Sequence, residues 1–111
     1  MRNKLFTISL FDSRYKRLVK KYPSLEFELL DLQNQLLLNP KIGTLLTANI
    51  YKIRVPNRDS QRGKSGGFRI ITYVLEETDN ACEINLVTIY DKSEESTFTK
   101  AELLKIIKQY V

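Results

Sequence analysis

The sequence contains no histidine and only one cysteine, Cys82. Without histidine, the chain lacks the commonest general acid or base and the commonest metal ligand. A single cysteine excludes an intrachain disulfide and a cysteine-rich zinc site, and it favours a reducing, cytoplasmic compartment. We therefore expect a protein that works without a metal or any other cofactor.

Long hydrophobic runs are also missing, and no segment approaches the roughly 18 apolar residues of a membrane helix. The short apolar run at residues 5–11 follows Arg2 and Lys4, as in a signal peptide. However, charged residues follow it at once, and no small-residue cleavage site is present. We expect no membrane among the partners.

The positive charge is confined to one short segment. The 111 residues, enough for a single domain spanning 1–111, include 18 basic and 13 acidic residues, a net charge of +5. Residues 52–69 hold six of the basic residues and one acid, which leaves twelve of each sign elsewhere. The six are Lys52, Arg54, Arg58, Arg62, Lys64 and Arg69. A concentrated basic patch on a neutral body indicates a polyanionic partner, with nucleic acid as the first candidate.

The hydrophobic periodicity predicts an α+β fold with the element order β-α-α-β-β-β-α. Alternation predicts strands at 6–10, 51–55 and 83–90, and a segment that is apolar on both faces predicts a strand at 68–75. Helical spacing predicts a hairpin of two helices around Pro23. A capping box of Thr99 and Glu102 starts the last helix. We expect a small antiparallel sheet whose central strand is 68–75, with the helices on one face.

The loop between the first two strands of this meander, residues 56–67, is twelve residues long, whereas hairpin loops usually have two to five. Its glycines permit close approach of a ligand to the backbone. Lys52 and Arg54 share a strand face, and Arg69 on the next strand is placed to face the same side. Tyr90 and Lys92 join them if the register of the last strand allows it. Such a cationic cup suits a phosphodiester backbone, although any one of these side chains is also an ordinary solvated surface residue.

A phosphate-binding loop of nucleotide hydrolases is not indicated by Gly63-Lys64-Ser65. The earlier glycine of that motif is missing, and the segment precedes a strand rather than a helix.

Four segments in this order resemble the RelE/ParE toxin superfamily, and its HigB-like branch most. They are Asn39-Pro40-Lys41-Ile42-Gly43, Tyr51-Lys52-Ile53-Arg54, Gly63 to Tyr73, and Ile89 to Glu94. The resemblance implies a RelE-like fold and the toxin of a type II toxin-antitoxin system. It implies a ribosome-dependent, metal-independent mRNA endonuclease that inhibits translation. The partners it implies are a cognate antitoxin, mRNA in the ribosomal A site, and the ribosome with its 16S rRNA.

Carried over by position, the resemblance assigns Lys64, Arg69 and Lys92 to catalysis around the scissile phosphate and Arg54 to RNA contact. From the charge pattern we add Lys52, Arg58 and Arg62 as RNA-binding candidates, and from its place at the end of the last strand we add Tyr90. Where many relatives have a second arginine this chain has Ser93, and where they place a tyrosine near the last helix it has Phe98. With histidine also absent, Lys64 or Lys92 is the candidate acid or base, because crowding by other cations lowers a lysine's pKa.

Two alternatives stay open. A ParE-like toxin shares the fold and inhibits DNA gyrase without being a nuclease, and it does not need the convergent basic set. A non-catalytic RNA-binding module needs aromatic side chains interleaved with the basic ones, and residues 52–69 offer only Phe68.

Overall fold

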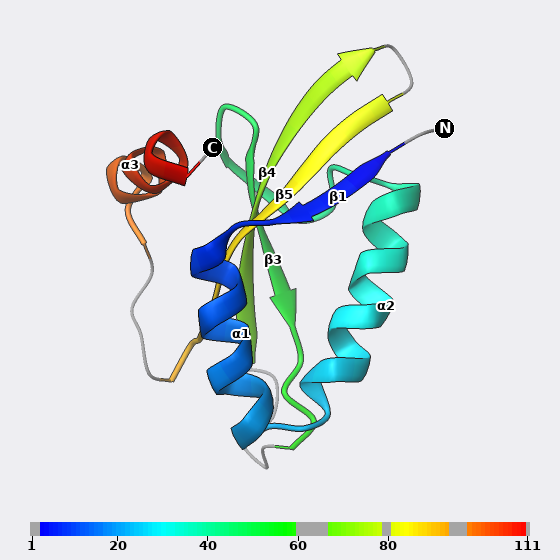
Figure 1. Ribbon diagram of the computed structural model, residues 1–111, viewed down its shortest axis with the longest axis vertical. Helices are drawn as coiled ribbons and strands as arrows, with labels where there is room; N and C mark the ends of the chain where they lie inside the picture. Colours follow the sequence, from blue (N-terminus) through cyan, green and yellow to red (C-terminus); the bar gives the residue numbers. More distant parts are fainter. Residues whose placement is uncertain (1–2, 60–66, 79–80, 94–97, 111) are drawn as a thin grey trace.

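The computed structural model describes residues 3–59, 67–78, 81–93 and 98–110. Over these residues the fold is α+β, with three helices and a five-stranded mixed sheet (Figure 1). In chain order the elements are β1 (Lys4–Thr7), α1 (Ser9–Lys21), α2 (Leu25–Leu38), β2 (Thr44–Thr47), β3 (Ile50–Val55), β4 (Phe68–Thr78), β5 (Ala81–Asp91) and α3 (Lys100–Tyr110).

The sheet has the strand order β1-β5-β4-β3-β2. The predicted antiparallel meander of β3, β4 and β5 is confirmed, and β4 is central as expected. The prediction of a purely antiparallel sheet is wrong, because β1 pairs parallel to β5, with Leu5 opposite Ile84. The edge strand β2 was not predicted, since four residues are too few for a clear period of two.

The first strand and the first helix meet earlier than the alternation predicts. Ile8 is the N-cap of α1, so Leu10 and Phe11 belong to the helix, and Asp12 lies inside its first turn. An acidic side chain in the first turn is favourable beside the positive end of the helix dipole. The apolar run at residues 5–11 is divided between β1 and α1, so its alternation does not indicate a strand that continues to residue 10.

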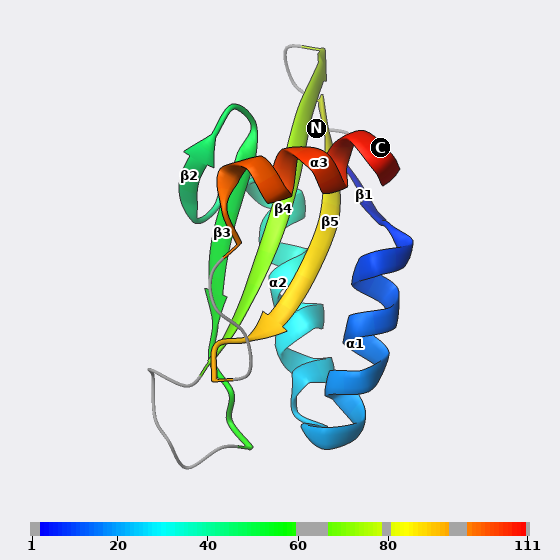
Figure 2. The same ribbon diagram turned by 90° about the vertical axis from the view of Figure 1, so that its left-hand side faces the viewer.

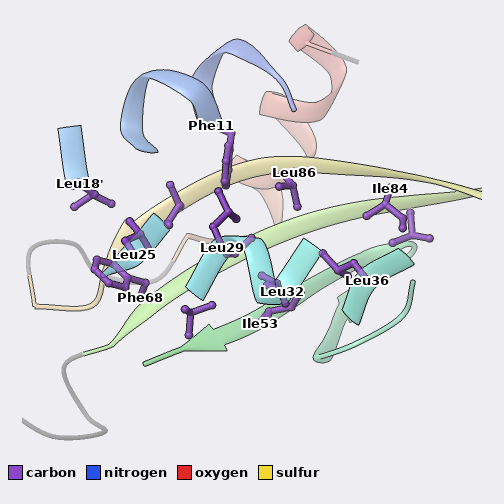
Figure 3. Close-up of a cluster of buried hydrophobic side chains, with 14 residues drawn as sticks. Phe11, Leu18, Leu25, Leu29, Leu32, Leu36, Ile53, Phe68, Ile84 and Leu86 are labelled. Atoms are coloured by element: carbon purple, nitrogen blue, oxygen red, sulfur yellow. The ribbon is translucent and has the colours of Figure 1, made fainter. Parts of the chain in front are cut away.

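Helices cover both faces of the sheet, which corrects the expectation of a single covered face. One hydrophobic cluster joins α1 and α2 to the sheet through residues such as Phe11, Leu36 and Leu86 (Figure 3). The second cluster joins Leu103 and Ile107 of α3 to the opposite face, against Ile71 and Val87. Figure 2 shows α3 crossing β4 and β5 on that second face. We call it the α3 face. In the described part of the chain, no helix combines the length and apolarity needed to span a membrane.

The predicted capping box at the start of α3 is confirmed. The backbone N–H of Thr99 donates to Glu102 Oε1 at 2.9 Å, and the N–H of Glu102 donates to Thr99 Oγ1 at 3.1 Å. Hydrogen bonding to the carboxylate from Thr99, first from its backbone N–H and then from its side chain, lowers the pKa of the Glu102 carboxyl. A lowered pKa means that the carboxylate stabilises the fold above its unfolded pKa, and that this contribution is lost as the pH falls through the folded pKa.

We therefore expect the melting temperature of Glu102→Ala to fall below that of the wild type by a pH-dependent amount. The gap is widest at neutral pH and narrows as the pH drops towards about 3, because protonation removes the wild type's advantage. Thermal melts followed by circular dichroism measure it. A gap that stays constant over this range would contradict the assignment.

Candidate functional site

Three predicted site residues lie side by side across the central strands. The register places Arg54 of β3 opposite Arg69 of β4, and Arg69 opposite Tyr90 of β5. Each of the three has a strand neighbour in the cluster under α1 and α2, namely Ile53, Ile70 and Ile89. Because side chains alternate along a strand, Arg54, Arg69 and Tyr90 therefore share the α3 face. We call these three residues the arginine row.

The arginine row holds two positive charges on directly opposed residues, an arrangement that destabilises a sheet. Arg54 is exposed, whereas Arg69 is only 3% exposed. Arg69 Nη1 donates to the Phe68 carbonyl oxygen at 3.2 Å. Within the described residues, no carboxylate forms an ion pair with either guanidinium.

Electrostatics at Arg69 reflect this crowding. Burial, followed by the nearby Arg54 charge, lowers the pKa of Arg69, and Tyr90 opposes the shift. An arginine nevertheless stays charged at neutral pH, since its ordinary pKa is far above 7. A buried, crowded cation of this kind is stabilised when an anion enters beside it.

A hollow of about 250 Å³ lies beside the two arginines, lined by Arg54, Val55, Pro56 and Arg69. Two guanidinium groups at one hollow offer several N–H donors in fixed planes, which match the oxygens of a phosphate or carboxylate. The geometry therefore favours an anion as the ligand of this hollow.

Lys92 lies at the end of β5, next to the start of β4. Its backbone N–H donates to the Gly67 carbonyl oxygen at 3.2 Å, and its side chain is exposed. The turn that carries it is fixed by Asp91, which is 1% exposed and whose Oδ1 accepts from the Ser93 N–H and hydroxyl at 3.0 and 2.9 Å. Asp91 is a site feature that the sequence reasoning missed, since an acid that begins a turn usually indicates a solvated residue.

The two other basic candidates that the structure describes, Lys52 and Arg58, have different surroundings. Lys52 is two residues from Arg54 on the same strand face and is half-buried, so it extends the positive surface by one row. Arg58 instead forms an ion pair with Glu28 of α2. Arg58 also lines a hollow that Arg54 lines, so its ion pair with Glu28 leaves it beside the arginine row, although part of its charge is neutralised there.

The first residues of the long loop are attached to the same hairpin. Asp59 Oδ2 accepts from the Ser24 N–H at 2.7 Å, and Asn57 Oδ1 accepts from the Asp59 N–H at 3.1 Å. Arg62 and Lys64, the other two predicted loop residues, lie outside the described residues.

Tyr90 has a different place from the one expected. Its side chain is fully buried, so Tyr90 is the covered end of the arginine row and is not available to RNA in this structure. Phe98, just before α3, packs edge-on against it with ring centroids 5.3 Å apart, and the Arg14 guanidinium lies 5.7 Å from the Phe98 ring centroid. The segment entering α3 therefore packs directly against Tyr90 of the arginine row, a link that the sequence did not reveal.

Metal binding has no support in the residues that the structure describes, where no group of three or more acidic or cysteine side chains converges. No protein-family model matches the chain. The functional argument therefore depends on the chemistry of the arginine row.

Proposed function

We propose that this protein is a RelE-like toxin, a ribosome-dependent and metal-independent endonuclease that cleaves translated mRNA and is neutralised by a cognate antitoxin. The observation that carries the proposal is the pair Arg54 and Arg69, two opposed cations at one hollow with no carboxylate partner in the described residues. Keeping such a pair costs stability, so it is best understood as a binding site for an anion. The confinement of all excess charge to residues 52–69 supports a long polyanion as that ligand.

The chemistry that fits these residues is an internal attack on the phosphodiester. The ribose 2′-oxygen forms a bond to phosphorus, its proton passes to a base, and the bond from phosphorus to the 5′-oxygen breaks. The 5′-oxygen takes up a proton, so the products are a 2′,3′-cyclic phosphate and a 5′-hydroxyl end. Arg69 and Arg54 stabilise the charge that develops on the phosphoryl oxygens.

Proton transfer falls to a lysine in this proposal. Arginine is a poor proton donor or acceptor near neutral pH, and histidine is absent. Lys92 and Lys64 therefore remain the proposed acid and base. Lysines alone make a weak catalyst, so orientation of the RNA by the ribosome supplies much of the rate.

The proposal predicts that cleavage depends on translation. We expect the purified protein to cut an mRNA in a translating extract and to leave the same RNA intact in buffer. Arg54→Ala should reduce the cutting by about tenfold or more, because one of two phosphate-binding cations is lost. Lys16→Ala removes an equal charge from the exposed side of α1 and is the matched control.

Strong metal-free cleavage of naked RNA at neutral pH would count against the proposal, as would equal loss of activity in Lys16→Ala. The readout is primer extension of the mRNA in both conditions.

A further inference from the structure

Helix α2 carries an apolar stripe on its outer side, directly opposite the face that it packs on the sheet. The buried face consists of Leu25, Leu29, Leu32 and Leu36, which point towards the strands (Figure 3). The outer stripe consists of Phe27, Leu30, Leu37 and Leu38, with exposed fractions of 73%, 58%, 38% and 74%. A surface helix is normally polar on its outer side, so a stripe of this kind marks an interaction site.

We infer that this stripe is a homodimer interface, in which α2 packs antiparallel against α2 of a second copy of the chain. The inference is independent of the proposed nuclease function. It depends on the symmetry of the stripe and on where the charges of α2 lie.

The stripe is complementary to itself in an antiparallel pair. Its apolar residues lie near the two ends of the helix, with the exposed Asn34 between them. Antiparallel packing about a two-fold axis brings Phe27 against the second copy's Leu38, and Leu30 against its Leu37. The two Asn34 side chains then meet near the axis, where a polar residue fixes the register of paired helices.

The distribution of acidic residues along α2 also favours antiparallel packing of the two helices. All three acids of α2, Glu26, Glu28 and Asp31, lie in its first half, and the helix has no basic residue. A parallel pair would place these acids together, whereas an antiparallel pair separates them. It also brings Glu26 near Lys41, which follows the C-terminal end of the second helix. The Lys41 side chain is half-exposed and forms an ion pair with Glu76. Its ammonium group has three N–H donors, so it can bind a second carboxylate as well.

The size of the stripe predicts a weak dimer. Four partly exposed apolar side chains with a polar rim match the pattern of a specific interface. They supply roughly half of the about 800 Å² per partner that a standard interface buries, so we expect a dissociation constant on the order of micromolar. Helices α2 and α3 lie on opposite faces of the sheet (Figure 2), and the arginine row shares the α3 face, so such a dimer leaves the exposed Arg54 uncovered.

The test is the mass of the full chain by sedimentation from about 1 to about 200 μM, with expected values rising from 13.0 kDa towards twice that mass. Leu30→Glu should weaken the dimer by at least about tenfold, since it buries a charge in the interface. Leu104→Glu is the matched control, because Leu104 is 51% exposed on α3, away from α2.

A second experiment checks the axis directly. In a Cys82→Ala background, Asn34→Cys should form a disulfide-linked dimer on oxidation, whereas Gln109→Cys on the exposed side of α3 should not. A mass of 13.0 kDa at every concentration overturns the inference and leaves the stripe to a different protein. Dissociation by Leu104→Glu as strong as by Leu30→Glu, or failure of Asn34→Cys to cross-link, overturns it equally.

Discussion

Replacing Arg69 by methionine is expected to reduce cleavage of translated mRNA by at least about a hundredfold, the usual effect of losing a main donor to a developing oxyanion. Methionine keeps much of the side-chain volume and removes the charge. Arg69→Lys should recover little activity, because a lysine ammonium lacks the planar fork that binds two phosphoryl oxygens. The measurement is the rate of mRNA cleavage in a translating extract.

The Arg69→Met variant should be at least as stable to unfolding as the wild type. Arg69 is buried opposite Arg54, and burial lowers its pKa, so the folded protein gains when this charge is removed. We expect the free energy of unfolding of Arg69→Met to rise by about 1 kcal/mol, measured by urea titration. A loss of both activity and stability would instead assign Arg69 a structural role and contradict the account of the site.

Replacing Gly67 by alanine is expected to impair both the fold and the site. A Cβ atom at this position would lie 2.6 Å from the Val55 carbonyl oxygen, so β3 and the start of β4 must move apart. Overpacking of this kind costs about 2 kcal/mol, which lowers the melting temperature by roughly 8 °C in a domain of this size.

The loss of cleavage activity in Gly67→Ala should be larger than its loss of stability accounts for, because Gly67 connects to both Arg69 and Lys92 of the site. It begins the segment that carries Arg69, and its carbonyl oxygen accepts from the Lys92 N–H. We expect at least about a tenfold loss of cleavage at a temperature where the variant is still folded. Ser13→Ala, an equally small change on the exposed part of α1, should leave both quantities nearly unchanged. Wild-type activity in folded Gly67→Ala would show that the spacing of β3 and β4 does not matter to the site.

Much of the fold follows from local patterns. The alternation along β3 and the leucine spacing of α2 each reflect one buried face, whereas the apolar runs of β4 and β5 reflect two buried faces, which is why these elements were predicted correctly. The parallel β1 and the placement of α3 depend on contacts between distant residues, such as Leu5 with Ile84 and Leu103 with the cluster around Val87. Periodicity gives the face that a strand or helix buries, but it does not give the element on which that face packs.

In the candidate site, too, local patterns predicted some features, and contacts between distant residues determined the others. Lys52, Arg54 and Arg69 were placed on one face because alternation fixes it. The pairing of Arg58 with Glu28 and the burial of Tyr90 beneath Phe98 were not foreseen, since both depend on helices that approach the sheet from elsewhere in the chain. Charge density along the sequence therefore indicated the region of the site, and the register of three strands selected its members.

The most direct test of the proposed nuclease function is the chemistry of the RNA ends produced in a translating extract that contains the wild-type chain. We expect cuts in phase with codons, 2′,3′-cyclic phosphate and 5′-hydroxyl ends, and cleavage by purified ribosome complexes that does not depend on a metal bound by this protein. Lys64→Ala and Arg69→Ala should remove these cuts while remaining soluble and folded. The absence of codon-linked ends with the wild type would contradict the proposed nuclease function. If both variants also still arrest the growth of cells that express them, a gyrase-type toxin is favoured.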